Sequence, residues 1–253
     1  MAAAVLMYHS LDDGGSPISV TPSIFAQQMQ TLHQRGLNVI SLTQLVDGLT
    51  NGEPLPDRSV VLTFDDGFEN VYQQAFPILQ QYGFPATVFL VAGYCGKTNH
   101  WPSQPAGIPR LPIMTWEQIH EMDRAGIEFG AHTHNHPRLD RVSGGELELE
   151  VVNAKRVLED HLGHRVDHFS YPYGRSDAGS AELVSQTYRG ACTTRLGTVS
   201  AKTNPLSLPR VDTYYVRQPQ IFKTLSTPAL SAYLAVRRPL RSAASMVLGR
   251  EWR

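Results

Sequence analysis

The stretch SVVLTFDDG, residues 59–67, decides the fold class. Its first part, SVVLTF, is rich in apolar and β-branched residues and is typical of a buried parallel strand. Two adjacent carboxylates, Asp65 and Asp66, follow directly, and they repel each other unless a positive group holds them. Polar residues at the carboxyl end of a parallel strand are typical of a functional site. A solvated turn that caps the next helix also fits these residues.

Strands and helices alternate on both sides of this stretch. Apolar runs predict further strands at 3–7, 37–41, 86–91, 127–131, 168–171 and 191–194. Apolar periodicity and capping residues predict helices at 22–35, 42–49, 68–82, 115–125, 143–162 and 181–188. This alternation indicates parallel strands with helical crossovers, in an α/β barrel or an open sheet. No linker or repeat divides the chain.

The composition is that of a globular protein. Of 253 residues, 42% are hydrophobic and 18% are charged, and the formal net charge is −1, so a dedicated nucleic-acid binder is not expected. Two cysteines, Cys95 and Cys192, are too few for a multi-thiolate zinc site; they are expected to be buried thiols, with a single disulfide as the alternative. No run reaches the roughly 18 apolar residues of a membrane span. Because Met1–His9 lacks a cationic region, we expect a cytoplasmic chain, although a chain trimmed of its leader would look the same.

A histidine cluster, HTHNHP at 132–137, follows the predicted strand at 127–131. Imidazole is a common ligand of zinc and similar metals. Asp66, His132 and His136 together make a site of two histidines and one carboxylate, which suits a metal that activates water. A polar surface loop is the alternative. A non-haem iron oxygenase uses the same ligand types, but the adjacent Asp65 favours water activation.

A third polar segment, FSYPYG at 169–174, also follows a strand. Pro172 fixes the backbone, and the N–H that follows it could donate to an oxyanion. A Pro-Gly turn packed by two tyrosines explains the segment equally well. The loop at 92–112 is long for a compact domain, so we expect it to be functional or mobile.

These three segments, in this order, resemble the polysaccharide deacetylase family, also called the NodB-homology family of carbohydrate esterases. The matching motifs are TFDDG at 63–67, HTxxH at 132–136 and PYG at 172–174, and the resemblance extends over residues 5–210. It implies a distorted (β/α)7 barrel in one domain, residues 1–220. It also implies a hydrolase that removes N-acetyl groups from the amino sugars of a glycan. The implied cofactor is a divalent metal ion, Zn²⁺ by default, with Co²⁺, Ni²⁺ or Fe²⁺ as alternatives.

The resemblance also implies roles for individual residues. Asp65 is the implied general base, and Asp66, His132 and His136 are the implied metal ligands. The main-chain N–H of Tyr173 is implied to stabilise the oxyanion.

The sequence departs from the family pattern at two places. The stretch directly before PYG reads FSY, residues 169–171, and has no arginine. No histidine follows His168, so the usual late histidine acid is absent. The MYHS segment at 7–10 is similar to the poly-N-acetylglucosamine deacetylase branch, which implies that His9 is the general acid; a capped strand end is the alternative. Arg210 could replace the missing arginine, since a guanidinium binds carboxylates well, or it could be a surface residue. His134 and His168 are not expected to be ligands.

The last segment, residues 221–253, is basic and amphipathic. Its arginines are Arg237, Arg238, Arg241, Arg250 and Arg253. A helix of this kind can lie on an anionic membrane, although packing on the barrel is the simpler expectation. The expected partner is an N-acetylated glycan. Two alternatives are hydrolysis of another C–N bond, in a formyl-sugar, lipid-linked sugar or ureide, and a catalytically silent glycan-binding protein.

Overall fold

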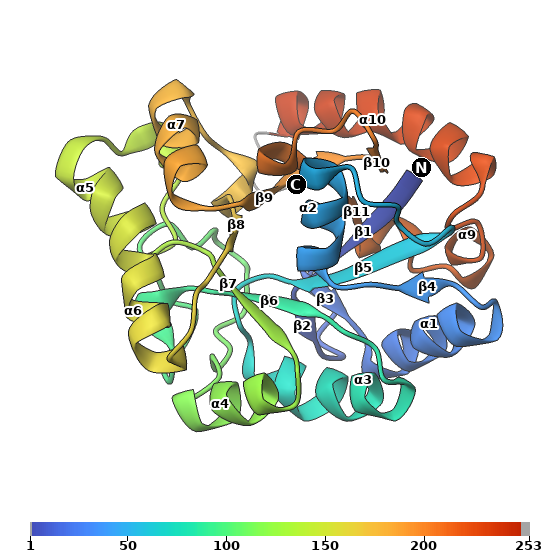
Figure 1. The fold of residues 1–253 in the computed structure, drawn as a ribbon, viewed down its shortest axis with the longest axis horizontal. Helices are drawn as coiled ribbons and strands as arrows, with labels where there is room; N and C mark the ends of the chain where they lie inside the picture. Colours follow the sequence, from blue (N-terminus) through green and yellow to red (C-terminus); the bar gives the residue numbers. More distant parts are fainter. Residues whose placement is uncertain (1, 249–253) are drawn as a thin grey trace.

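A closed barrel of seven parallel strands forms the centre of the molecule (Figure 1). The computed structural model describes residues 2–248, with side chains for residues 3–240. In spatial order the strands are β1 (Ala2–Tyr8), β5 (Ser59–Phe64), β6 (Thr87–Leu90), β7 (Glu128–Ala131), β8 (His168–Ser170), β9 (Gly190–Leu196) and β11 (Leu208–Asp212). Because β11 pairs with β1, and β1 pairs with β5, the sheet has closed on itself. The expected (β/α)7 barrel is confirmed.

Short strands outside this ring distort it. The strand β4 (Asn38–Val39) pairs with the start of β5, whereas β6 pairs with its end, so two strands share one edge of β5. An antiparallel strand, β10 (Val199–Ser200), covers the start of β1. A separate pair, β2 (Ser10–Leu11) and β3 (Ser19–Val20), folds the segment after β1 into a loop.

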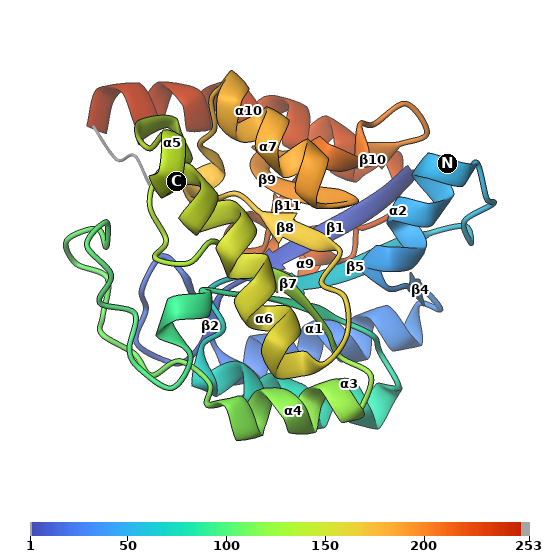
Figure 2. The same cartoon turned by 60° about the vertical axis from the view of Figure 1, so that its left-hand side comes forward.

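Helices surround the barrel (Figures 1 and 2). They include α1 (Pro22–Gln34), α2 (Leu42–Asn51), α3 (Phe76–Tyr82), α4 (Trp116–Arg124), α5 (Gly144–Glu148), α6 (Ala154–Leu162) and α7 (Ala178–Thr187). Side chains cap two of these helices: Thr21 accepts a hydrogen bond from the N–H of Ile24, and Thr115 with Gln118 forms a capping box. These caps satisfy backbone donors that have no partner inside their helices.

Three helices differ from the sequence prediction. The helices expected at 68–82 and 143–162 each contain one π turn, η1 (Val71–Ala75) and η4 (Leu149–Asn153). One extra residue in a helix does not disturb the apolar periodicity enough to be seen in a sequence. The helix α7 begins three residues before the predicted Ala181, because Asp177 caps it by accepting a hydrogen bond from the N–H of Ser180.

The strand side chains alternate between two apolar layers. On β1, Ala4 and Leu6 pack against the outer helices, whereas Ala3 and Val5 belong to a smaller cluster inside the barrel. The helix α2 contributes Leu42, Leu45 and Val46 to this inner cluster. The interior of the barrel is therefore filled by apolar side chains. Residues just after the carboxyl ends of the strands continue the same alternation, so their side chains point inward above this layer and can form a site there.

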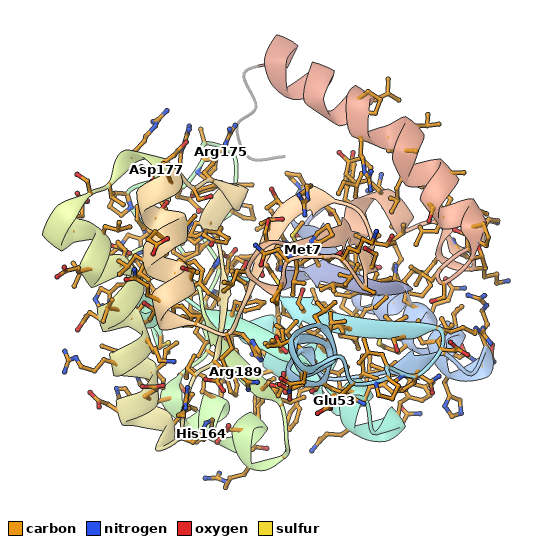
Figure 3. The ribbon with its side chains drawn as sticks, turned by 45° about the horizontal axis from the view of Figure 1, so that its top comes forward. Met7, Glu53, His164, Arg175, Asp177 and Arg189 are labelled. Carbon is orange, nitrogen blue, oxygen red and sulfur yellow. The ribbon has the colours of Figure 1, made fainter. Side chains whose placement is uncertain are left out.

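Residues 213–248 are mainly helical. They form α8 (Thr213–Val216), α9 (Pro219–Phe222) and α10 (Pro228–Leu248), and α10 runs along one edge of the molecule (Figure 3). Leu230 and Leu234 are buried, and Arg238 Nε donates to the Leu196 carbonyl at 2.7 Å, so the first half of α10 packs on the barrel. Among residues 2–248, no helix combines the length and apolar character that a membrane crossing requires. Arg250 and Arg253, and the side chain of Arg241, lie outside the described residues.

Candidate active site

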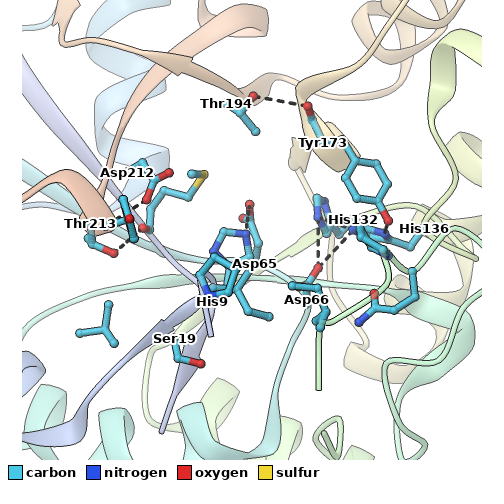
Figure 4. A pocket seen from close by; sticks show the side chains of 18 of the residues that line it. His9, Ser19, Asp65, Asp66, His132, His136, Tyr173, Thr194, Asp212 and Thr213 are labelled. Atoms are coloured by element: carbon cyan, nitrogen blue, oxygen red, sulfur yellow. Dashed lines mark hydrogen bonds and ion pairs between the residues drawn. The ribbon is translucent and has the colours of Figure 1, made fainter. Parts of the chain in front are cut away.

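A pocket opens at the carboxyl end of the barrel, where the inward-facing positions of several strands meet (Figure 4). His9 continues the inward alternation of β1, and Asp65 continues that of β5. His132 follows β7 in the same way. The long loop at 92–112, which was expected to be functional or mobile, contributes Trp101, among others, to the pocket wall. In Figure 2 this loop and β2 lie at the same end of the barrel.

Asp66, His132 and His136 converge on one point. Asp66 Oδ1 lies 3.5 Å from His132 Nε2 and 3.2 Å from His136 Nε2, and the two Nε2 atoms lie 3.2 Å apart. All three residues are buried, and Asp66 Oδ1 has no hydrogen-bond partner. A buried carboxylate oxygen without a partner is costly, and two imidazoles with one carboxylate are a common ligand set for Zn²⁺. The three predicted ligands therefore fit a divalent metal ion.

Hydrogen bonds on the far side of each imidazole fix its orientation. His132 Nδ1 donates to the Ser170 carbonyl at 2.7 Å. His136 Nδ1 faces the Tyr173 hydroxyl at 3.1 Å, and that hydroxyl donates to the Ser103 carbonyl at 2.9 Å. Burial raises the pKa of Tyr173 to about 12, so the hydroxyl keeps its proton. Protonation at Nδ1 leaves both Nε2 lone pairs directed at the Asp66 carboxylate, as metal ligation requires.

Backbone strain is concentrated at this site. Six non-glycine residues of the described chain have a positive φ, and four of them belong to the site. These four are Asp66 (73°), Thr133 (66°), His136 (60°) and Tyr173 (58°). Each costs about 1–3 kcal/mol and persists only where the surroundings enforce it. Gly174 follows in the same region, and a Cβ there would lie 2.1 Å from Thr194 Oγ1, so only glycine fits.

Arg210 pairs with Asp65 inside the barrel. Its Nη1 and Nη2 donate to Asp65 Oδ1 and Oδ2 at 2.7 and 2.6 Å, a bidentate ion pair. The remaining donors contact the Thr193 carbonyl, Thr63 Oγ1 and Ser170 Oγ. Arg210 is 1% exposed, so it is not the surface residue that the sequence left possible. The arginine that is absent before PYG is thus matched by one on β11.

The pair keeps Asp65 ionised. Burial alone would raise the pKa of Asp65, but the charge and the two hydrogen bonds of Arg210 outweigh it and hold the pKa far below its ordinary value. Burial would raise the pKa of Asp66 as well, but its close contact with His136 outweighs burial and lowers it. Both carboxylates are therefore negative and available as acceptors.

His9 lies beside Asp65, on the open side of the pocket (Figure 4). Its Nε2 is 3.9 Å from Asp65 Oδ2, and its side chain is 23% exposed. His134 and His168, which were not expected to be ligands, lie elsewhere. The N–H of His134 donates to Glu150, and His168 Nε2 contacts Thr43 Oγ1 at the opposite end of the barrel, so neither joins the three ligands.

The buried His132 makes the metal-free protein sensitive to acid. Burial lowers the pKa of His132 from 6.5 to about 4. Between these two values the unfolded chain binds a proton at His132 and the folded chain does not. The free energy of unfolding should therefore fall as the pH falls through this window, by about 3 kcal/mol from this residue. Urea unfolding of chelator-treated protein at pH 6.5 and 4 checks this result. His132→Asn should reduce the pH dependence, and an unchanged dependence would contradict the assignment.

Comparison with known proteins agrees with this geometry. The family model described as "Polysaccharide deacetylase" matches residues 52–189, which include the DDG and HTHNH segments and PYG. This chain belongs to the polysaccharide deacetylase family. The enzyme class expected from the sequence is thereby confirmed.

Relatives of the family cover different shares of the chain. The Bacillus subtilis protein YxkH, whose name assigns it to the polysaccharide deacetylases, is 29% identical over 208 residues, which are 82% of this chain and 70% of YxkH. The poly-β-1,6-N-acetyl-D-glucosamine N-deacetylase of Escherichia coli K12 is 31% identical over 170 residues, 62% of this chain. Those residues are 24% of the E. coli enzyme, so the present chain spans about a quarter of that relative's length.

Solved structures share the fold. The deacetylase PplD of Streptococcus pyogenes, in complex with acetate, has a TM-score of 0.78 and 27% identity, and the match covers 90% of this chain and 99% of PplD. IcaB of Ammonifex degensii has a TM-score of 0.72 and 26% identity, with 92% and 97% of the two chains covered. Each of these two matches covers nearly the whole length of the present chain and of the solved structure.

Two features of this site were not predicted from the sequence. The Tyr173 hydroxyl bonds to His136, although only the main-chain N–H of this residue was considered. Glu150 is buried and accepts hydrogen bonds from residues 132–137, the histidine loop. The sequence did not distinguish Glu150 from the other acidic residues of the same predicted helix, and the structure shows that the neighbouring carboxylates are exposed.

Proposed function

We propose that this protein is a metal-dependent N-deacetylase acting on the N-acetylated amino sugars of a glycan. The observation that carries the proposal is the buried, unpartnered Asp66 Oδ1, which lies within 3.5 Å of two imidazole Nε2 atoms beside an open pocket. A catalytic metal site keeps a coordination position open for water or substrate, and three protein ligands leave such a position.

The residues of the chain divide the chemistry among them. Asp66, His132 and His136 would hold the ion; when bound, it supplies a Lewis acid that polarises the acetyl carbonyl and makes a water more acidic. Asp65 takes the proton of the attacking water as the oxygen adds to the amide carbon. The main-chain N–H of Tyr173 donates to the oxyanion. His9 protonates the leaving amine.

Arg210 shapes the role of Asp65. The bidentate pair holds the carboxylate in one orientation, so little rearrangement is needed during the reaction. Because the pKa of Asp65 is low, this side chain is ionised and has a free lone pair to accept a proton. His9 Nε2, 3.9 Å from Asp65 Oδ2, is the nearby group that can carry a proton to the leaving amine.

Loss of His9 should affect the chemical step and not the metal. An amide anion is a poor leaving group, so the amine must be protonated as the C–N bond breaks. His9→Ala should lower kcat by about a hundredfold while the metal content stays normal. Steady-state acetate release with metal analysis of the same sample checks both parts. His134→Ala serves as the matched control, and a His9→Ala enzyme with native kcat would exclude the role.

The pocket wall favours an uncharged glycan. Trp101, Tyr214 and Tyr215 line it, and the described residues that line it include no lysine or arginine. Aromatic side chains suit the apolar faces of sugar rings, whereas a diphosphate-linked sugar would need cationic partners. Together with the names of the relatives, this wall supports poly-N-acetylglucosamine as the substrate class.

A substrate panel tests the reaction and the substrate class. Acetate, formate and ammonia are measured separately after incubation with N-acetylglucosamine oligomers, formyl-sugars, lipid-linked sugars and ureides. The proposal expects acetate from the oligomers. Formate or ammonia as the main product would assign the site to another C–N bond. Oligomer binding without any product would favour a silent glycan-binding protein.

A further inference from the structure

Glu150 is a buried carboxylate that neither the metal triad nor the proposed catalytic steps use. It is 2% exposed and lies in the π turn η4, on the helical segment behind the histidine loop. A buried carboxylate is unfavourable unless hydrogen bonds satisfy it. Single π turns occur frequently at functional sites. The partners of Glu150 therefore indicate what its charge is for.

The hydrogen bonds that Glu150 accepts within the described chain all come from one two-residue stretch. Glu150 Oε2 accepts from the N–H of His134 at 2.9 Å and from the N–H of Asn135 at 2.7 Å. Glu150 Oε1 accepts from Asn135 Nδ2 at 2.8 Å. These two residues lie between the ligands His132 and His136. The carboxylate therefore holds the centre of the loop whose two ends bind the metal.

This stretch of the loop requires an external anchor. Thr133 and His136, which flank it, both have positive φ, and two successive N–H groups turn toward the same carboxylate oxygen. Consecutive backbone N–H groups in such a turn form a concave site for an anion. The turn brings His136 Nε2 back to 3.2 Å from His132 Nε2. A neutral side chain at position 150 would satisfy the turn less well.

We propose that Glu150 is a positioning residue for the metal site: its carboxylate sets the separation of the two histidine ligands by anchoring residues 134 and 135. The inference rests on the proposed metal site. Loss of this anchor should weaken metal binding and not abolish it. His136 would still be present, but the loop would have to rearrange, at a cost in free energy, before its imidazole reached the ion.

Glu150→Gln tests the inference with zinc alone as the probe. A glutamine keeps the size of the side chain but removes the negative charge that the two N–H groups face, and its NH₂ group cannot accept a hydrogen bond. The dissociation constant for Zn²⁺, measured by chelator competition on metal-free protein, should rise about 10- to 100-fold. The kcat at saturating zinc should return toward the wild-type value. Glu148→Gln, an exposed site two residues earlier, is the matched control and should bind zinc as the wild type does.

Each outcome decides a different question. An unchanged zinc affinity in Glu150→Gln would overturn the inference, even if the melting temperature of the metal-free protein fell. If Glu150→Gln does not fold, Asn135→Ala removes one of the three hydrogen bonds and should weaken zinc binding about fivefold; an unchanged affinity there would also overturn it. If the wild-type protein itself binds no zinc, the proposed metal site fails and not the role of Glu150 alone.

Discussion

Replacing His136 with alanine is expected to remove most of the bound metal and nearly all of the deacetylase activity. The structure offers three protein ligands, and two of them are too few to retain a catalytic ion against dialysis. The substitution should also leave Asp66 Oδ1, which has no hydrogen-bond partner, with only the His132 imidazole beside it. Metal per chain after equilibration with zinc and dialysis, together with acetate release, measures the two effects on one preparation.

His134→Ala is the control for this experiment. It removes an imidazole from the same loop, but its ring does not join the three ligands, and the backbone N–H that bonds Glu150 remains. This variant should retain its metal. Full metal occupancy in His136→Ala would show that the ion, if any, binds elsewhere.

Asp65→Asn should keep the metal and lose at least about a hundredfold in activity. An amide cannot take a proton from water, whereas Asp66 and the two histidines remain in place. The change also leaves the buried Arg210 without its counter-charge, and breaking a buried ion pair in this way costs about 3–5 kcal/mol. The variant should therefore melt earlier, so activity is measured well below its melting temperature.

The neighbouring aspartate provides the comparison. Asp66→Asn should lose metal, since a neutral amide is a poorer ligand than a carboxylate. If Asp65→Asn loses the metal and Asp66→Asn keeps it, the roles of the two residues are the reverse of those proposed.

The parts of the site that follow directly after strands could be predicted from the sequence. Asp65, Asp66 and His132 each follow an apolar run, and the alternation of a strand together with barrel closure brings such positions to one end. For Arg210 the sequence left two alternatives, a partner of the catalytic carboxylate or a surface residue, and the structure pairs it with Asp65. In these cases local pattern and fold geometry agree.

The groups that hold the two histidine ligands in place could not be predicted, because they depend on backbone conformations that the sequence does not indicate. Glu150 reaches the histidine loop from a π turn inside a run read as one regular helix. The Tyr173 hydroxyl reaches His136 because Tyr173 itself has a positive φ, which a tyrosine rarely adopts. Both conformations are stabilised by contacts with distant segments, so no local pattern indicates them.

Acetate release during a zinc titration tests the central claim most directly. Protein treated with chelator and freed of it is mixed with an N-acetylglucosamine oligomer, and zinc is added in steps below and above one equivalent per chain. The account predicts no acetate without metal, a rise with added zinc and a plateau near one equivalent, and no rise in His136→Ala. Acetate release at full rate from the chelator-treated protein, or none at any zinc concentration, would contradict it.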